Sequence, residues 1–425
     1  MEANEISDHA QTRALSDAGK AQNLYFGKGN IMKKLFVLLL AVIMAGCGSE
    51  TVQQEREVPA ADNYRTVCEY IAGYMQPAPG GRYELLRHTD GSADILYTDI
   101  AAAARKPLGS DTTVEIAHEV VTGIFVRDGY LYHYSHGAPL GMKEEEDEAV
   151  LYQYDMDGKL LQACRLGRNI EPDMDSAVVS DGKWLYFSGN ELIYENGKVA
   201  ESTSHIYAVN QDSMEIKNVY TPQHATVDII CGYRNSLVTE VTYYKTDKDG
   251  NREFKTGIEL LDMKTLERKP LFTTSNLWYS MCDGKLYNPY DTNGSIKIYD
   301  LEKLEETTVE VVKDARMLKN GYVAVNFITE RYAFLSFEYY NNMPGENYVY
   351  DFETDTLSPA PDFCEMPYLY SEESGYYIVQ TGYDKVPVAE DFYTVYNIHY
   401  ALITPEDYHS GTENLIPITN IIEYR

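Results

Sequence analysis

Two histidines, His133 and His136, stand three residues apart and form the pair best spaced to bind a metal ion. Imidazole nitrogens are common zinc ligands. In a β-strand, however, residues three apart point to opposite faces. No Asp or Glu stands at ligand spacing beside the pair. We therefore expect no metal site here, and no motif elsewhere in the sequence implies a cofactor.

The segment Asp247-Lys248-Asp249-Gly250-Asn251 has the beginning of a calcium-binding loop. It lacks the third acidic ligand and the late bidentate glutamate that such loops use. Because it stands between two apolar segments, we interpret it as the tip of a hairpin. The segment Asp291-Thr292-Asn293-Gly294 leads to the same interpretation.

No nucleophile motif is present. The sequence has no Gly-x-Ser-x-Gly elbow, and no cysteine stands near a histidine. Two carboxylates facing each other could hydrolyse a glycosidic bond. With 66 Asp and Glu residues such pairs arise by accident, so we assign no catalytic residue.

One polar loop is the strongest candidate for binding a ligand. The segment Glu338–Asn347 combines aromatic rings, amides and a Pro-Gly turn, and its candidate residues are Tyr339, Tyr340, Asn341 and Asn342. Loops held by a rigid scaffold are where binding residues concentrate. The segment that begins at Tyr383 and runs to Tyr396 is the second candidate, with Tyr383 as its ligand-binding residue.

These segments are positioned by a repeat. Its first mark is a tight turn followed by an aromatic-rich strand, which places a glycine or asparagine at positions 81, 129, 182, 235, 284, 321 and 375. Asp-Gly and Asn-Gly accept the positive φ that tight turns between strands need. The second mark is a strand that ends in a polar residue before a short turn, at positions 98, 155, 210, 262, 300, 351 and 404.

Apolar and polar residues alternate in these strands, which is typical of half-buried β-strands. Seven repeats of about forty to fifty residues are typical of β-propeller blades, because one four-stranded sheet buries both faces only against its neighbours. We predict an all-β fold, a β-propeller over residues 64–425 with seven four-stranded blades. Six or eight blades, or a pair of β-sandwiches, are the alternatives. A helix is expected only around Thr66–Tyr74.

Three connections occupy equivalent positions in the repeat, at Ser135–Glu148, Tyr339–Asn347 and Asp384–Asp391. Equivalent positions predict one common face. That face would be acidic, from Glu144–Glu148 and from Glu346, Glu390 and Asp391, so it suits cationic or hydroxyl-rich partners.

The segment Met32–Cys47 indicates where the protein works. Two lysines precede an apolar run from Leu35 to Ala45, which is the order of a secretory signal. The ending Met-Ala-Gly-Cys resembles the lipobox of bacterial lipoproteins, and this resemblance implies lipidation of Cys47. We divide the chain into a leader at 1–31, a signal peptide at 32–46, a lipidated tether at 47–63 and the propeller at 64–425.

Residues 1–31 are polar and stand oddly before a signal peptide. We interpret Met32 as the true start. The alternative is an added leader, since Asn23-Leu24-Tyr25-Phe26 faintly resembles a protease tag.

The composition excludes some partners. A net charge of −30 repels phosphate backbones, so we expect no nucleic acid. The five cysteines after Cys47 are scattered singly, which predicts small buried side chains and at most one or two disulfides. The 38 tyrosines favour a structural role in strands over a sugar-binding surface.

Together, the signal and the repeat resemble bacterial lipoproteins that carry a β-propeller on a lipid tether. This resemblance implies a protein of the bacterial cell envelope, facing outside the cytoplasm. The expected function is a non-catalytic binding or assembly module, with the membrane as one partner through Cys47 and an unknown protein or glycan as the other. The alternative is an extracytoplasmic glycan hydrolase or lyase.

Overall fold

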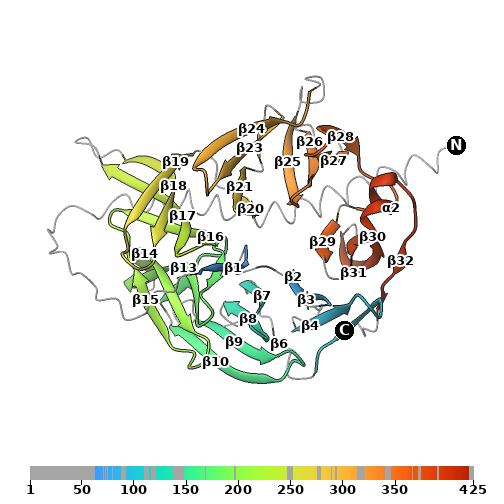
Figure 1. The fold of residues 1–425 in the computed structure, drawn as a ribbon. Coiled ribbons are helices and arrows are strands. Elements are labelled where there is room, and N and C mark those ends of the chain that lie inside the picture. The colour runs from blue at the N-terminus through green and yellow to red at the C-terminus, as the bar shows by residue number, and fades with distance from the viewer. Residues whose placement is uncertain are drawn as a thin grey trace. The chain divides into compact units, whose positions relative to one another are not determined.

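The computed structural model describes residues 63–420, except for 70, 72, 74, 79, 88–91, 110–113, 116–120, 137–147, 168, 196–197, 247–251, 275–278, 289, 292–293, 314–320, 340–345, 366, 372–374 and 390–391. The strands form seven sheets whose main strands are antiparallel, and the fold is a seven-bladed β-propeller (Figure 1). The predicted fold class and blade count are therefore confirmed, and the β-sandwich alternative is wrong.

The described residues of 63–277 and 419–420 belong to one compact unit, which holds four sheets. Sheet one contains β2 (Met75–Ala78), β3 (Gly81–Arg87), β4 (Ser92–Asp99), β5 (Ala104–Pro107), β6 (Val114–Glu115) and β33 (Thr419–Asn420). Sheet two contains β7 (Val121–Arg127), β8 (Tyr130–His136), β9 (Ala149–Asp155) and β10 (Leu160–Gly167). Sheet three contains β1 (Arg65–Cys68), β11 (Ile170–Pro172), β12 (Val178–Ser180), β13 (Trp184–Glu195), β14 (Lys198–Asn210) and β15 (Ile216–Tyr220). Sheet four contains β16 (Ala225–Tyr233), β17 (Ser236–Thr246), β18 (Arg252–Asp262) and β19 (Arg268–Thr273).

Residues 278–418 belong to a second compact unit, which holds the other three sheets. Sheet five contains β20 (Ser280–Cys282), β21 (Lys285–Asn288), β23 (Ser295–Asp300) and β24 (Glu305–Glu310). Sheet six contains β22 (Tyr290–Asp291), β25 (Gly321–Ile328), β26 (Tyr332–Tyr339), β27 (Glu346–Asp351) and β28 (Thr356–Pro359). Sheet seven contains β29 (Pro367–Ser371), β30 (Tyr376–Ala389), β31 (Phe392–Ile403) and β32 (Ile416–Pro417).

Each core cluster lies between neighbouring sheets of one unit, and strand β13 shows why. Its residues alternate: Leu185 and Phe187 belong to the cluster shared with sheet two, whereas Trp184 and Tyr186 belong to the cluster shared with sheet four. Alternate side chains of a strand point to opposite faces. The period-two pattern in the sequence is therefore the pattern of a sheet buried on both faces.

The turn after the third strand of each blade explains the second repeated mark. In sheet four, the Asp262 carboxylate accepts hydrogen bonds from the backbone N–H groups of Lys264 (2.7 Å) and Thr265 (2.9 Å). Leu266 then takes a positive φ of 59° and donates its N–H to the Asp262 carbonyl. An Asp or Asn side chain that holds its own turn in this way has a local physical reason to recur.

Two expectations about local structure are wrong. The segment around Thr66–Tyr74 begins with strand β1, not a helix. The described helix is α2 (Pro405–Ser410), which starts at the N-cap Thr404, the last position of the second mark. In the sixth blade the turn between the first two strands lies at residues 329–331, between β25 and β26, and not at Gly321, where β25 begins.

Among the described residues, no helix is long and apolar enough to cross a membrane. The five cysteines after Cys47 are all free thiols, with Cys68, Cys164 and Cys231 buried and Cys282 and Cys364 half-buried. The expectation of small buried side chains holds for the first three, and no disulfide joins any of the five. Many tyrosines are also core residues: Tyr64, Tyr132, Tyr134, Tyr154 and Tyr186 are almost completely buried.

Candidate functional site

Two of the predicted ligand residues, Tyr339 and Tyr383, lie in described strands of sheets six and seven. Tyr339 is the last residue of β26 and stands opposite Gly321 of β25. Tyr383 lies within β30, where it is half-buried. The other candidates, residues 340–342, and the lipidation site Cys47 lie outside the described residues.

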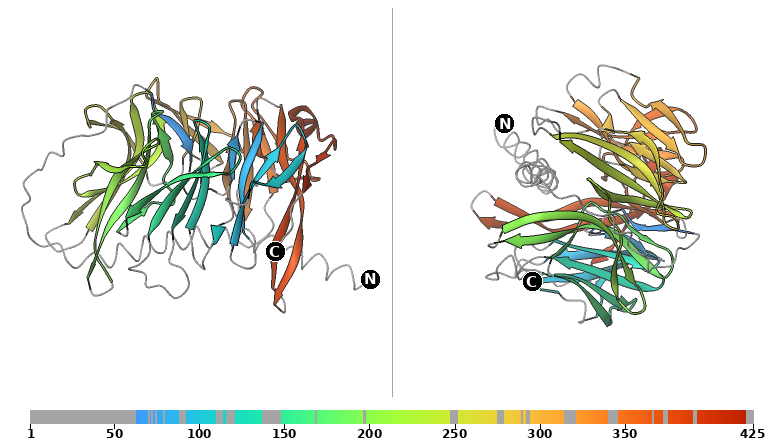
Figure 2. Two further views of the ribbon diagram at one scale, coloured as in Figure 1. Left: turned by 90° about the horizontal axis from the view of Figure 1, so that it is seen from below. Right: turned by 90° about the vertical axis from the view of Figure 1, so that its left-hand side faces the viewer.

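Strands β30 and β31 form a ribbon that is longer than the rest of its sheet. They have 14 and 12 residues, but β29 pairs only as far as Val379, and β32 pairs only with Ala401 and Leu402. Beyond these positions the two strands pair with each other, and Figure 2 shows the ribbon extending past its sheet. The expected loop at 384–391 is therefore mostly strand, since β30 continues to Ala389.

The base of this ribbon carries an exposed hydrogen-bonded pair, His399 and Asp384, next to Tyr383 in the sequence. His399 Nε2 lies 3.1 Å from Asp384 Oδ2, and the two side chains are 46% and 56% exposed. His399 stands opposite Gly382, which has no side chain to cover the imidazole. The carboxylate and the imidazole lie on one face of the ribbon, where they can hydrogen-bond to a polar ligand, whereas the Tyr383 ring lies on the other face, because consecutive side chains of a strand alternate.

A second polar pair holds the inner end of the ribbon. Gln380 Nε2 donates to Glu365 Oε1 at 3.0 Å, and the Glu365 N–H donates to the Gln380 carbonyl at 2.9 Å. The register between β30 and β31 shifts near Gln380 and again after Asp384. Such bulges bend a ribbon and re-aim its side chains, which suits a segment that positions a binding surface.

The expected acidic face can be followed only in part. Residues 144–147, 390 and 391 lie outside the described residues. Glu148 forms an ion pair with Arg165 at 2.5 Å, and Glu346 accepts a hydrogen bond from the Tyr348 hydroxyl at 2.8 Å. Both described carboxylates therefore contact a partner in their own sheet.

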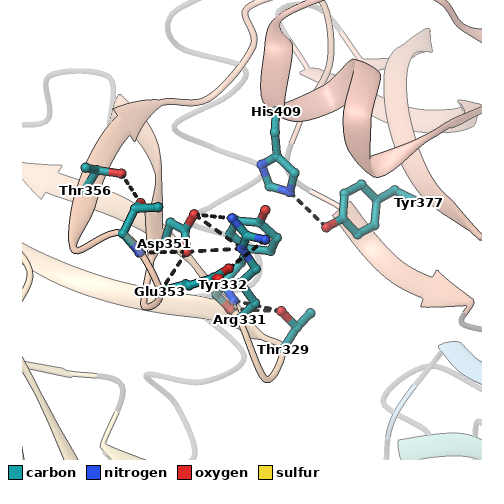
Figure 3. A network of polar contacts seen from close by, with 9 residues as sticks. Thr329, Arg331, Tyr332, Asp351, Glu353, Thr356, Tyr377 and His409 are labelled. Atoms are coloured by element: carbon teal, nitrogen blue, oxygen red, sulfur yellow. Dashed lines mark hydrogen bonds and ion pairs between the residues drawn. The ribbon is translucent and has the colours of Figure 1, made fainter.

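A denser polar network lies at the other end of sheet six, in the turns before β26 and after β27 (Figure 3). Arg331 donates from Nη2 and Nε to Asp351, at 2.9 Å and 3.2 Å, and its Nη1 lies 2.8 Å from Glu353. The guanidinium also lies over the Tyr332 ring. The hydrogen bonds from Arg331 lower the pKa of Asp351 to about 2.

His409 of α2 connects this network to sheet seven. Its imidazole stacks on Tyr332, with ring centroids 3.9 Å apart, and its Nε2 lies 3.1 Å from the Tyr377 hydroxyl. Burial lowers the pKa of His409 to about 4, so the ring is neutral at pH 7. Because the charges are paired and the imidazole is packed between rings, we interpret this network as a joint between two blades. From the sequence we interpret His409 as an isolated histidine, because its partners Tyr332 and Tyr377 lie far away along the chain.

Two histidines of the other unit, His133 and His205, also contact neighbouring side chains. His133 is buried and stacks on Tyr152, and burial lowers its pKa to about 4. His205 Nδ1 lies 2.8 Å from Thr221 Oγ1, and its Nε2 lies 3.5 Å from Glu191. Across the part of the chain that the structure describes, no group of three or more His, Cys, Asp or Glu side chains could hold a metal ion.

No protein-family model matches the chain, and a search of curated proteins finds no match. Among solved structures, it is similar to a Pyrococcus horikoshii acylaminoacyl peptidase at 12% identity, over 78% of this chain and 51% of that one, with a TM-score of 0.46. It is similar to the β-propeller domain of the Trilobed protease from Pyrococcus furiosus at 11% identity, over 66% and 90% of the two chains, with a TM-score of 0.36. It is also similar to an ulvan lyase of a new polysaccharide lyase family at 9% identity, over 85% and 96%, with a TM-score of 0.36. The chain spans about half the length of the acylaminoacyl peptidases, and these similarities concern the propeller fold alone.

Proposed function

We propose that the protein is a binding or assembly module of the bacterial cell envelope, held at a membrane by a lipid on Cys47. The lipobox-like segment ending at Cys47 supports the anchor, and the propeller supplies a rigid scaffold from which hairpins project. Binding residues concentrate on segments of this kind. The ligand contacts a surface of the propeller and is not transformed.

The observation that carries this proposal is the ribbon of β30 and β31. Its outer part extends past the flanking strands, and it places half-buried Tyr383 on one face and the exposed pair of Asp384 and His399 on the other. Both faces suit a hydroxyl-rich glycan, because an aromatic ring can pack on a sugar face and the carboxylate and imidazole can bond sugar hydroxyls. We therefore place a glycan first among the ligand classes.

A glycan and peptide array probed with the full-length protein tests the proposal. Any ligand found is then titrated against Tyr383→Ala and Asp384→Asn. We expect each variant to weaken binding at least tenfold without a change in melting temperature, because both side chains are at least partly exposed. The matched control is Tyr194→Ala, another half-buried tyrosine in a long hairpin. Equal binding by all four proteins would remove the ribbon as the binding element.

The competing function is a glycan hydrolase or lyase. Hydrolysis needs two carboxyl groups about 5–10 Å apart around the scissile bond. An activity screen on each glycan that binds separates the two functions: release of a reducing end or an unsaturated sugar would establish an enzyme.

A further inference from the structure

Strand β1 fixes the place where the described chain enters its unit. The Tyr64 N–H donates to the Arg234 carbonyl at 2.6 Å, and the Gly232 N–H donates to Thr66 Oγ1 at 3.0 Å. The Tyr64 ring is almost completely buried and makes an edge contact with Tyr186. The entry point is therefore packed against sheets three and four.

This entry point lies at one particular end of those sheets. Arg234 belongs to the turn between β16 and β17, and Arg65 pairs with Ser180, next to the turn between β12 and β13. We call this the turn end. The long hairpins β13–β14 and β17–β18 close at the opposite end. Strand β18 has 11 residues, so at about 3.3 Å per residue the two ends are roughly 30 Å apart.

The turn end carries charged side chains of both signs. Arg65, Lys183 and Arg234 are exposed beside the entry point, in a chain whose net charge is −30. Exposed Asp212 and Glu267 lie in turns at the same end, and the carboxylate of Asp181 is occupied within its own turn. Its oxygens accept from the N–H groups of Lys183 and Trp184 and from the Tyr186 hydroxyl, at 2.8, 2.7 and 2.8 Å.

We infer that the turn end of sheets three and four faces the bilayer, where Arg65, Lys183 and Arg234 contact anionic lipid headgroups, and that the hairpins β13–β14 and β17–β18 point away from it. This inference rests on the proposed lipid at Cys47. The fifteen residues from Gly48 to Asp62 span at most about 50 Å. If the hairpin ends faced the membrane instead, the segment 48–62 would have to run along the whole length of the blade, which would take more than half of its maximum span.

Energy transfer to a bilayer-bound acceptor tests the orientation. A fluorescent amino acid is placed at exposed Lys264, at the turn end of β18, or at exposed Glu253, at its hairpin end. The lipid-anchored protein is reconstituted into phosphatidylcholine vesicles containing about 30% phosphatidylglycerol. We expect at least twofold higher transfer from position 264 than from 253. Equal transfer, or the reverse order, would overturn the inference.

The basic residues are tested with the triple variant Arg65→Gln, Lys183→Gln, Arg234→Gln. It should reduce the difference in transfer on anionic vesicles, because each Lys or Arg near such a surface strengthens binding about fivefold. The matched control, Lys245→Gln with Lys255→Gln, removes exposed charges near the hairpin end and should change nothing. If the triple variant behaves like wild type, the headgroup contact is wrong.

Failure of the anchor is distinguishable from failure of the orientation. Mass spectrometry of the same preparation shows whether Cys47 carries a lipid. If it does not, the proposed anchor fails. The chain coupled at residue 47 to a synthetic phospholipid then tests the orientation by itself, with the same two fluorophore positions and the same expected order.

Discussion

Replacing Gly232 with alanine should loosen the N-terminal strand from the propeller. A methyl group on Gly232 would lie 2.7 Å from the carbonyl carbon and oxygen of Tyr64 and 2.8 Å from Val179 Cγ1. Two of these atoms are backbone, so they cannot move aside as the end of a flexible side chain can. Strand β1 must shift, and the hydrogen bond between the Gly232 N–H and Thr66 Oγ1 is strained with it.

The expected loss in the free energy of unfolding of Gly232→Ala lies between two limits. Overpacking a well-packed site costs about 1–3 kcal/mol. If the shift also exposed the whole Tyr64 ring, the loss of about 150–250 Å² of buried area at about 25 cal/mol per Å² would cost about 4–6 kcal/mol. The strand is held at several points, so we expect partial exposure and a loss of about 2–4 kcal/mol in the free energy of unfolding.

Urea-induced unfolding, with limited proteolysis around residues 63–69, measures both effects. The control is Gly382→Ala, because a methyl group there meets only His399 Nδ1 at 3.7 Å, an ordinary contact. This control should unfold within about 0.5 kcal/mol of the wild type. If Gly232→Ala is as stable as Gly382→Ala and its N-terminal strand resists protease equally, the packing argument is refuted.

Three further predictions concern single ionisable groups. The folded pKa of Asp351 is lowered to about 2, against about 3.9 unfolded. The ionised Asp351 therefore stabilises the fold above pH 4, and this contribution is lost as the pH falls toward 2. Asp351→Asn should remove it and lower the free energy of unfolding by about 1 kcal/mol after allowing for screening. His409 has a folded pKa of about 4, against about 6.5 unfolded, so the unfolded chain binds more protons and stability falls as the pH drops from 6.5 to 4; an NMR titration of its ring between pH 5 and 8 would contradict this. Burial raises the pKa of Cys164 to about 11, so iodoacetamide should modify this thiol slowly in the folded protein and at least a hundredfold faster in urea. Half-buried Cys282 serves as the comparison.

The sequence predicted those parts of the fold whose causes are local. The polar residue that ends the third strand of a blade recurs because its side chain holds its own turn, as Asp262 does with the N–H groups of Lys264 and Thr265. The Asp-Gly turns recur because their backbone takes positive φ, as at Asp128 and Gly129. Such causes act over four or five residues, so they leave a visible period in the sequence.

The parts that the sequence did not predict depend on contacts between distant segments. In the sixth blade a turn of Thr329, Glu330 and Arg331 stands where the others have a glycine or an asparagine, and Arg331 is held there by Asp351, twenty residues away. The pattern therefore placed the turn at Gly321, where a strand begins. Likewise His409 looked isolated, because Tyr332 and Tyr377 meet it only after the blades have packed.

The candidate site also depends on contacts between distant segments, which the sequence does not reveal. The sequence identified Tyr383 as a ligand residue, but it predicted a loop after it, and the structure has a continuous ribbon there. Asp384 and His399 are fifteen residues apart and meet only because the strands pair in that register. The period-two pattern could have suggested a longer strand, but the register, with its bulges, is set by pairing across the ribbon.

The path of the chain before the first blade would matter for the lipid tether that we propose at Cys47. Strand β1 does not join the neighbouring sheet one in sequence but pairs with β12 in sheet three, and Tyr64 bonds to sheet four through Arg234. A pull on the N-terminus therefore acts first on hydrogen bonds and ring contacts shared by sheets three and four, and not on β2. If Gly232→Ala frees β1, the point where the tether leaves the propeller moves away from these two sheets. The same variant should then abolish the difference in energy transfer between positions 264 and 253 while Cys47 keeps its lipid, which would connect the packing of β1 directly to the orientation at the membrane.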